Sequence, residues 1–429
     1  MSGCAAIIEG EIFDITPRPI PPYERPPELD YLNAAANYYE LHAAVLYLIT
    51  HHSESGRIVI HGYEGEIEED FEKVRHDILN YDPLGTFAVY DISGAETRIG
   101  TYLGFDIDIE YRISQRQVES ILPIYSVQEL TDALLRYMGE YRDEIIFRTS
   151  LPDVTANMVT ALVRTLYYEN PRGIVIMPVT SAEVFPETHG DDKIIELQLR
   201  FGDESGILHQ RGGSLADAVR RNAELAVGGN DEEKLRALAE NLIASCDFDY
   251  GAAMTVAEHG SQRTEATAYG ALVAGRAVGE GFAMAFKALC DELGFDCRIV
   301  LGTLDGRVHA WNIVYIDGDY YDVAGDYYHI DVAMCDVNGV ETAFLKADAD
   351  FEEMYAWERD GTVSCSGTLT YEDIVGTEEP DDPGEIEDEP SDTNNGTEDI
   401  PPDPPPGEPD EPQEPDDEPP PEPHEIDTT

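Results

Sequence analysis

One amphipathic helix followed by two strand-like runs limits the folds open to this chain. From Gly279 to about Leu293, apolar residues recur at helical spacing, which predicts a helix with one apolar face. Two strand-like runs, Cys297–Leu301 and His309–Ile316, come next, and an Asp317-Gly318 turn follows them. The apolar face of the helix consists of Phe282, Phe286, Leu289, Cys290 and Leu293. The pattern predicts one amphipathic helix followed by at least two strands.

Two short motifs in this stretch carry a resemblance to a known family. The helix opens with Gly279–Ala283, which reads Gly-Glu-Gly-Phe-Ala, and the second strand contains His309–Asn312, which reads His-Ala-Trp-Asn. Together they resemble the active-site segment of the bacterial transglutaminase-like superfamily, whose papain-like fold is shared by transglutaminases and some peptidases. The resemblance covers residues 229–375 and implies an α+β fold with a helix packed on an antiparallel sheet.

The resemblance also implies a catalytic triad, which this sequence holds only in part. In the family a Cys at the helix N-terminus is the nucleophile, and a His on a strand moves its proton. Gly279 stands at the position of the Cys, and no Cys or Ser lies within four residues on either side. Glycine has no side chain, so an acyl-enzyme cannot form there. His309 stands at the position of the family's His.

The third member of the triad, an Asp that orients the His, has two possible positions. Counting about fifteen residues from His309, as in the family, leads to Ala324. The family's Tyr-x-hydrophobic-Asp pattern fits Tyr327–Val332 better, which places the Asp at Asp331, seven residues later. In a uniformly extended hairpin an odd insertion would turn Asp331 to the opposite face, unless a bulge or a looser loop restores it. We favour Asp331 over Ala324.

Three kinds of function follow from a triad without its nucleophile. The first, which we favour, is a catalytically degenerate domain that binds a peptide, glycan or protein partner. The second is an active hydrolase or peptidase that uses a displaced Cys or a His309–Asp331 pair that activates water. The third is a purely structural packing unit. For the first, the resemblance predicts a binding groove lined by Glu280, Trp311 and Asn312.

Neither the cysteines nor the acidic clusters predict a metal or cofactor site. The six cysteines contain no Cys-x-x-Cys pair, which indicates buried, inert thiols, with a disulfide between Cys290 and Cys297 as the alternative. The acidic runs at 336–339 and 348–353 complete no known calcium-binding loop. We therefore predict no metal and no cofactor.

The remaining chain divides by composition into three parts. Residues 1–29 form an extended, Pro-rich lead-in. Residues 30–228 alternate helical and strand-like patterns, and Thr131–Arg136 resembles Val159–Arg164 at a spacing of 28. Each of these helices precedes a strand-like run, Glu144–Phe147 and Gly173–Met177. The pattern predicts an α/β layer domain of unknown role, with helices on one face of its sheet.

Charge limits the partners and the location of the chain. Residues 376–429 contain 22 Asp and Glu, no Lys or Arg and many prolines, which predicts a disordered tail. A net charge of −61 disfavours binding to nucleic acids and anionic membranes. No run is long and apolar enough to predict a transmembrane helix. Met1–Cys4 resembles the end of a lipoprotein cleavage box, so Cys4 is a candidate lipid anchor, with a chance Cys near the terminus as the alternative. We expect a bacterial exterior or cell-envelope location, with the cytoplasm as the alternative.

Overall fold

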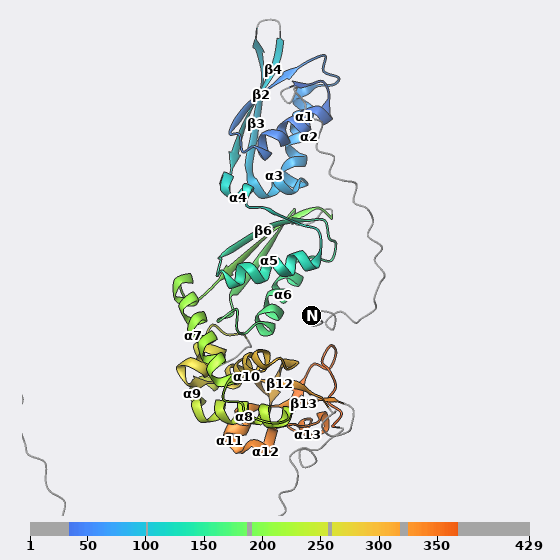
Figure 1. Ribbon diagram of the computed structural model, residues 1–429. Helices are drawn as coiled ribbons and strands as arrows, with labels where there is room; N and C mark the ends of the chain where they lie inside the picture. The colour runs from blue at the N-terminus through green and yellow to red at the C-terminus, as the bar shows by residue number, and fades with distance from the viewer. Residues whose placement is uncertain (1–33, 100–101, 187–190, 256–259, 318–324, 368–429) are drawn as a thin grey trace, which may run out of the picture. The chain divides into compact units, whose positions relative to one another are not determined.

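A computed structural model describes residues 34–99, 102–186, 191–255, 260–317 and 325–367 of the chain (Figure 1). The predicted lead-in with Cys4, the residues around Ala324 and the acidic tail lie outside the described residues. Within the described ranges, no helix combines the length and the apolar character needed to span a bilayer. The expected α+β class is confirmed, because the described chain combines helices with four-stranded sheets.

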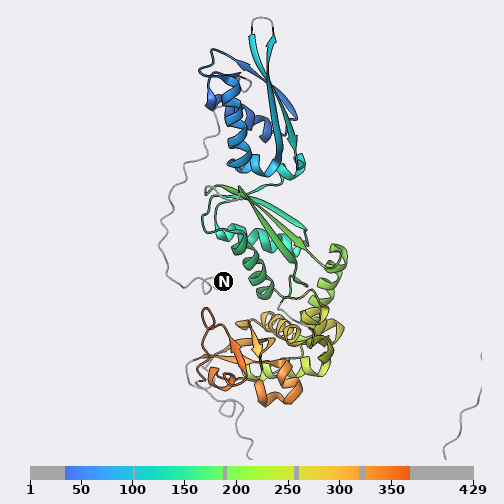
Figure 2. The same cartoon turned by 180° about the vertical axis from the view of Figure 1, so that it is seen from behind.

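The first module, residues 34–111, consists of a four-stranded mixed sheet with helices on one face (Figures 1 and 2). The sheet order is β1-β2-β4-β3, with β1 parallel to β2 and the other neighbours antiparallel. Buried apolar residues of the helices and strands form its core. Its elements are β1 (Ala34–Ala35), α1 (Tyr38–Thr50), β2 (Ser55–Ile60), α2 (Ile67–Asn80), α3 (Pro83–Ala88), β3 (Val89–Ile99) and β4 (Tyr102–Tyr111).

The second module, residues 122–200, follows a short helix and has a sheet of the same design. The order is β5-β6-β8-β7, again with one parallel pair, β5 and β6, and two antiparallel pairs. Helices α5 and α6 precede and follow β6 along the chain. The elements are α4 (Gln115–Glu119), β5 (Leu122–Ile124), α5 (Val127–Gly139), β6 (Glu144–Thr149), α6 (Ala156–Glu169), β7 (Val179–Phe185) and β8 (Lys193–Arg200).

The two modules are related by a constant shift along the chain. Adding 89 to both bounds of α1, β2 and α2 gives the bounds of α5, β6 and α6. Two residues with positive φ obey the same shift, His52 with φ 50° and Tyr141 with φ 52°. Non-glycine residues rarely adopt this conformation. The shared topology, the equal lengths of these elements and a shared unusual turn indicate two copies of one βαβαββ unit.

Sequence similarity between the copies is clearest at buried positions. Leu41, Ala44, Val45 and Ile49 of α1 are buried, and the residues 89 positions later in α5 are buried too. Those partners are Leu130, Ala133, Leu134 and Met138. The predicted 28-residue repeat relates α5 to α6, two neighbouring helices of one module. It reflects a shared amphipathic pattern, whereas the repeating unit is the whole module.

Two further expectations for residues 30–228 differ from the structure. The region contains two sheets rather than one helix-covered sheet. The run Gly173–Met177, expected to be a strand, is irregular backbone, although Ile174 to Met177 are all buried. A short apolar run shows that a segment is buried, but its length and periodicity do not decide whether it is a strand.

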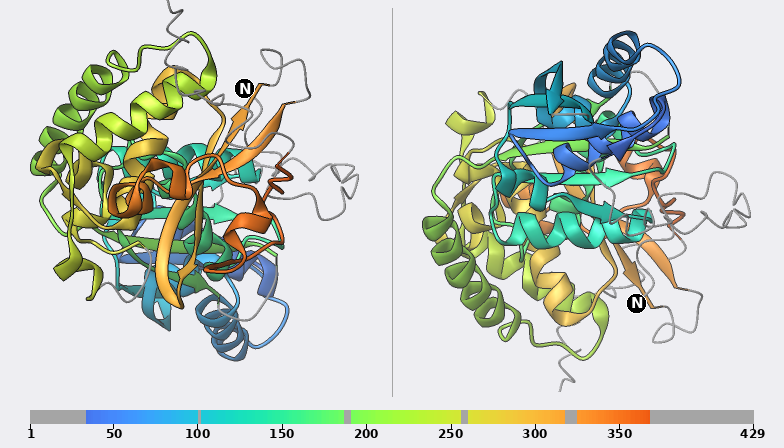
Figure 3. Two further views of the ribbon diagram at one scale, coloured as in Figure 1. Left: turned by 90° about the horizontal axis from the view of Figure 1, so that it is seen from below. Right: turned by 90° about the horizontal axis from the view of Figure 1, so that it is seen from above.

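The C-terminal domain, residues 231–367, consists of a central helix packed on an antiparallel sheet, as expected (Figure 3, yellow-green to red). Helix α7 (Ser205–Ala223) leads into it and packs on α10 (Gly279–Leu293). The sheet order is β13-β12-β11-β14, from β11 (Cys297–Leu304), β12 (Arg307–Ile316), β13 (Asp326–Ile330) and β14 (Tyr355–Trp357). The other elements are α8 (Asp231–Ser245), β9 (Asp247–Phe248), α9 (Tyr250–Ala253), η1 (Thr264–Ala266), η2 (Gly270–Ala274), β10 (Arg276–Ala277), α11 (Val332–Asn338), α12 (Val340–Ala343) and α13 (Asp348–Phe351).

Helix α10 is buried along most of its length, from Gly279 to Cys290. It contacts the two strands β11 and β12 and the two helices α7 and α8. A helix enclosed on several sides has apolar residues all around it rather than along one face. Buried small residues such as Ala283, Ala285 and Ala288 therefore lie between its larger side chains. Its core is continuous with that of the second module.

Candidate functional site

The site is built on the first turn of α10, which the preceding backbone holds in place. Val278 precedes the helix and donates its backbone N–H to Glu265 O at 2.8 Å. Gly281 allows this approach, because a Cβ at that position would lie 2.3 Å from Glu265 O. Gly279 is the first residue of α10, so its N–H belongs to the unpaired donors of a helix N-terminus. That end of a helix favours negative charge.

His309 lies on β12, directly against this turn. The side-chain amide of Asn312 donates to Ala283 O at 3.0 Å and ties β12 to α10. A Cβ on Gly279 would lie 2.3 Å from His309 Cε1 and 2.4 Å from Nδ1. Real Cβ atoms do not approach other atoms so closely. The imidazole ring therefore occupies the space in which a side chain at position 279 would begin.

Asp331 holds His309 from the other side of the ring. His309 Nε2 and Asp331 Oδ2 are 2.6 Å apart, and Asp331 is buried. The same carboxylate accepts the Tyr355 hydroxyl at 2.8 Å through Oδ2 and the Met334 N–H at 3.1 Å through Oδ1. Asp331 is thus also the N-cap of α11. Three donors converge on one buried carboxylate, which fixes its position and, through it, that of the imidazole.

The strand register explains why Asp331 reaches His309. Asn312 pairs with Ile330, so Asp331, the next residue, lies opposite Trp311. Trp311 and His309 are two residues apart on β12 and share a face of the sheet. The seven extra residues of the sequence come between β12 and β13. They therefore do not shift the pairing of the two strands, and Asp331 stays on the same face as His309. Ala324, the alternative position, lies outside the described residues.

These contacts define which nitrogen of His309 carries its proton. A carboxylate only accepts hydrogen bonds, so His309 Nε2–H donates to Asp331. The Nδ1–Cε1 edge then faces Gly279. The side chain of His309 is 11% exposed. The imidazole is thus oriented by Asp331, and its free edge faces a residue that has no side chain.

A second histidine lies behind the site in a separate hydrogen-bonded chain. The Trp311 indole N–H donates to His329 Nδ1 at 2.9 Å, and His329 Nε2 lies 2.8 Å from Asp348 Oδ1. Trp can only donate, so Nδ1 accepts and Nε2 carries the proton. Burial lowers the pKa of His329 despite the opposing effect of Asp348. The buried ring is therefore neutral near pH 7.

The same place contains the donor atoms of a three-residue cluster. The side-chain donors of His329, Asp348 and Cys365 lie within 4.8 Å of one another. A metal would need the lone pair of His329 Nε2, but the contact from Trp311 leaves the ring proton on that atom. Arg359 also forms a 2.8 Å ion pair with Asp348. These contacts fit a hydrogen-bonded packing cluster better than a cation site.

The residues predicted to line a groove are instead buried. Glu280 is 3% exposed, and its Oε1 accepts from Tyr168 and from the Gly260 N–H, each at 2.9 Å. Trp311 and Asn312 are both 0% exposed. The prediction of a groove wall is therefore wrong for these three positions. Glu280 connects α10 to helix α6 of the second module, Trp311 fills the core, and Asn312 ties strand to helix.

None of the described cysteines has the properties of a nucleophilic thiol. Cys246, Cys290, Cys297, Cys335 and Cys365 are all buried free thiols, so Cys290 and Cys297 form no disulfide. Burial raises the pKa of Cys246 and of Cys335 to about 12 in each case. Burial also raises the pKa of Cys290 and Cys365. A nucleophilic Cys requires the opposite shift and access to solvent.

Comparison with known proteins identifies part of the chain. Residues 219–341, which include Gly279, His309 and Asp331, match the model of the transglutaminase-like superfamily. The chain contains a transglutaminase-like domain. A solved structure titled "Crystal structure of a TGase" is similar over 53% of this chain at 11% identity and a TM-score of 0.25. The likeness covers 60% of that protein's length. No curated protein matches the chain.

Two residues at the site of the transglutaminase-like domain were missed in the sequence. Tyr355, which contacts Asp331, lies 24 positions later on β14 and belongs to no motif that includes the His or the Asp. His329 gave a weak signal, because it lies on β13 only two positions before Asp331. Its partner Asp348 comes from a distant helix and could not be assigned from spacing alone.

Proposed function

We propose that the transglutaminase-like domain of this chain is catalytically degenerate and that the chain acts as a binding protein for a peptide, glycan or protein partner. The observation that carries the proposal is the position of the His309 ring, which fills the space beside Gly279. A site that had only lost its thiol would retain room for it. Here the His309 ring takes up the space that a side chain at position 279 would need.

The chemistry of the site supports the same proposal. Acyl transfer needs a nucleophile that forms a covalent bond with the carbonyl carbon and a base that removes its proton. Position 279 has no such atom, and the five described cysteines are buried. His309 and Asp331 remain as a hydrogen-bonded pair whose contacts also cap α11 and join two strands. A structural use of these contacts explains why they persist without the nucleophile.

Turnover assays on the full chain test this proposal. The wild-type protein would be assayed for amine incorporation into glutamine peptides and for hydrolysis of peptide and ester substrates. The variant to compare with it is His309→Ala. Glu240→Ala, at an exposed position of α8, is the control for effects of substitution and purification that do not depend on the site. We expect no turnover that depends on His309. Turnover in the wild type that disappears in His309→Ala, and persists in the control, would overturn the proposal.

A second candidate function has one specific observation in its favour. The His309–Asp331 contact of 2.6 Å is intact, and the His309 side chain retains 11% exposure. Such a pair can act as a general base toward water, a contribution of roughly 10²–10⁴-fold in enzymes. This non-covalent hydrolase would release product without a covalent intermediate. The same assay separates the two functions, because only the hydrolase needs His309.

The location that accompanies this proposal is the exterior or cell envelope of a bacterium. Support comes from the Met1–Cys4 pattern and from the strongly acidic composition, which disfavours nucleic-acid partners. Labelling with a fatty-acid analogue in a bacterial host tests the anchor at Cys4. Incorporation that is abolished by Cys4→Ser is expected, whereas an unlabelled wild-type protein would remove the anchor from the proposal.

A further inference from the structure

The first module packs on one face of the sheet of the second module. Ile146 of β6 and Ile194 of β8 are buried in the core of the first module, and helix α3 contacts β7 and β8. Phe185 of β7 packs on Phe87 of α3, with 5.3 Å between the ring centroids. The module interface is therefore an apolar contact that includes Ile146, Phe185 and Ile194.

Three carboxylates lie beside this apolar contact, on the same face of the sheet. Glu196 follows Ile194 by two positions on β8, so the two side chains point to the same side. Glu183 of β7 lies directly opposite Glu196, and like charges in such a pair repel each other. The side-chain amide of Gln198 donates to Glu144 of β6 at 2.8 Å and to Glu196 at 2.7 Å. These shared contacts hold the carboxylates of Glu144 and Glu196 close together.

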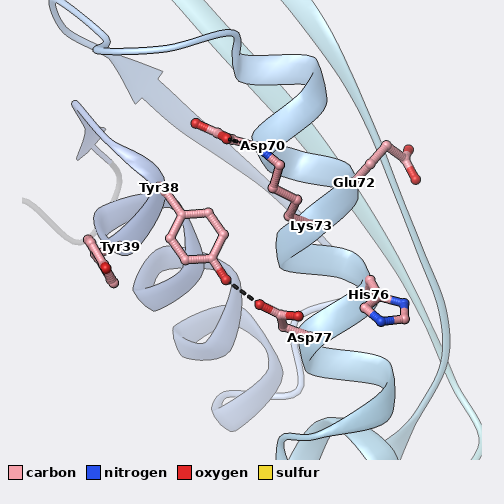
Figure 4. Close-up of a pocket in the computed structure, with 7 residues that line it drawn as sticks. All are labelled: Tyr38, Tyr39, Asp70, Glu72, Lys73, His76 and Asp77. Carbon is pink, nitrogen blue, oxygen red and sulfur yellow. Dashed lines mark hydrogen bonds and ion pairs between the residues drawn. The ribbon is translucent and has the colours of Figure 1, made fainter.

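The arrangement differs from that of the acidic side chains in the surface hollow between α1 and α2 (Figure 4). There Asp77 accepts the hydroxyl of Tyr38, and Asp70 accepts Lys73 Nζ at 3.0 Å. Each of these carboxylates has a hydrogen-bond donor of its own, which favours its charged form. At the module interface, one neutral amide is shared by two carboxylates.

Arg112 brings a positive charge to the module interface from the segment after β4. Its Nε donates to the backbone carbonyl of Phe87, and its guanidinium lies 4.9 Å from the centroid of the Phe185 ring. Burial lowers the pKa of Arg112, and the charges of Glu196 and Glu183 oppose that shift. The guanidinium thus faces two carboxylates, and the third carboxylate adjoins them, so the negative charge at this place is only partly balanced.

The environment of Glu196 favours its protonated form. Burial raises the pKa of Glu196, the hydrogen bond from Gln198 opposes this shift, and the neighbouring charges of Glu144 and Glu183 add to it. The folded protein therefore binds a proton at Glu196 more tightly than the unfolded chain, in which the carboxyl has its ordinary pKa of 4.5. The stability that this group contributes rises as the pH falls through the raised pKa and is fully present below about pH 4.5.

A second set of charged groups lies around the N-terminus of α3. Asp82 is the N-cap of this helix and accepts the Gly85 N–H at 2.7 Å. Arg148 of β6 forms a 2.5 Å ion pair with Asp192 of the second module. Burial raises the pKa of Asp82, against the hydrogen bond from Gly85 and the charges of Arg148 and His42. This carboxyl therefore also binds a proton more readily in the folded protein than in the unfolded chain.

We propose that the module interface is a pH-sensitive contact, in which acidification stabilises the packing of the first module on the second. Protonation of Glu196 removes a charge from a partly buried position, and the neutral carboxyl can donate a hydrogen bond to Glu144 instead of repelling it. The repulsion from Glu183 across the strands disappears at the same time. The response needs no ligand and lies outside the transglutaminase-like domain.

Amide hydrogen exchange of the full chain, followed by mass spectrometry, tests the proposal. Glu196→Gln is the informative variant, because its neutral amide stands for the protonated carboxyl. Glu96→Gln is the matched control, since Glu96 is exposed on β3 and lies outside the apolar contact. The peptides to compare cover α3 and β7, two elements that meet at the interface. Wild type and variants are compared with one another at about pH 7.5 and again at about pH 5, so the pH dependence of the intrinsic exchange rate cancels.

At about pH 7.5, exchange in these peptides should be about two-fold or more slower in Glu196→Gln than in the wild type. At about pH 5 the difference should shrink, because the wild type then carries the proton itself, and Glu96→Gln should match the wild type at both pH values. Equal exchange of the wild type and Glu196→Gln at about pH 7.5, or a difference that does not shrink at about pH 5, would overturn the proposal. Faster exchange in Glu196→Gln would overturn it as well, because it would show that the charge of Glu196 holds Arg112 at the interface.

Discussion

A methyl group at position 279 tests how closely the His309 ring packs against α10. In Gly279→Ala, the new Cβ would lie 2.3 Å from His309 Cε1, so the ring must move. The ring is held by its 2.6 Å contact with buried Asp331, and hydrogen bonds to charged groups contribute about 1.5–3 kcal/mol. Replacing Gly by Ala in a helix recovers up to about 1 kcal/mol. We therefore expect a net loss of about 1–2 kcal/mol in the free energy of unfolding.

Urea denaturation followed by tryptophan fluorescence measures this change in the correct domain. The chain has two Trp residues, Trp311 and Trp357, and both belong to the sheet of the transglutaminase-like domain. With a urea dependence of about 1–3 kcal/mol per molar, the midpoint should fall by roughly 0.3–2 M. Gly213→Ala in α7 is the matched control, since a Cβ there meets no atom within 4 Å. It should leave the midpoint unchanged or raise it.

A double-mutant cycle identifies the ring as the cause. In the His309→Ala background no imidazole remains, so Gly279→Ala should be neutral or stabilising by up to about 1 kcal/mol. The coupling between the two substitutions should therefore be about 1–3 kcal/mol. Equal effects of Gly279→Ala in both backgrounds would refute the packing argument, as would a stabilising effect in the wild type.

Two further predictions concern the groups around the dyad. Tyr355→Phe removes the 2.8 Å hydrogen bond to buried Asp331 and should lower the free energy of unfolding by about 1.5–3 kcal/mol, measured by the same denaturation; an unchanged midpoint would contradict the contact. His329 has its pKa lowered from 6.5 by burial, so the folded protein binds fewer protons at this ring than the unfolded chain does. The contribution of the neutral His329 ring to the free energy of unfolding is fully present above about pH 6.5 and is lost as the pH falls. The wild type should therefore lose more stability between about pH 7.5 and 5 than His329→Gln does. Parallel pH profiles of the two proteins would show that His329 does not titrate as described.

The helix and strands of the C-terminal domain could be predicted because their patterns are local. Apolar spacing after Gly279 predicted α10, which spans Gly279–Leu293, and the two following runs are β11 and β12. The run Gly173–Met177 is different, because its apolar residues are consecutive and carry no period. It is buried as its composition suggests, yet its backbone is irregular rather than extended in a sheet. A local sequence pattern predicts a helix or strand reliably when its residues are apolar and also recur with the period of that element.

The surroundings of the candidate site could not be predicted, because they depend on distant contacts. The motif residues Trp311 and Asn312 suggested a groove, but their partners, His329 and Ala283, enclose them in the core. Glu280 is covered by Tyr168, which lies 112 positions earlier in the second module. A family motif indicates which residues lie near a site, but it does not show which of them are exposed.

The duplication in residues 34–200 was hidden for a related reason. The two modules preserve their topology, the lengths of three elements and many buried positions, while few residues are identical between them. A search for repeated letters therefore found two neighbouring helices at a spacing of 28 and missed the spacing of 89 that relates whole modules.

Site-resolved alkylation of the folded chain would show whether it contains a thiol nucleophile. All six cysteines would be mapped by mass spectrometry after reaction across about pH 5 to 9, with the urea-unfolded protein as the reference. We expect the five described cysteines to react far more slowly in the folded protein than in the unfolded one, because they are buried. We also expect that none of the six is labelled unusually fast below about pH 7. One cysteine that reacts rapidly at low pH only in the folded protein would reveal a displaced nucleophile and show that the domain is not degenerate.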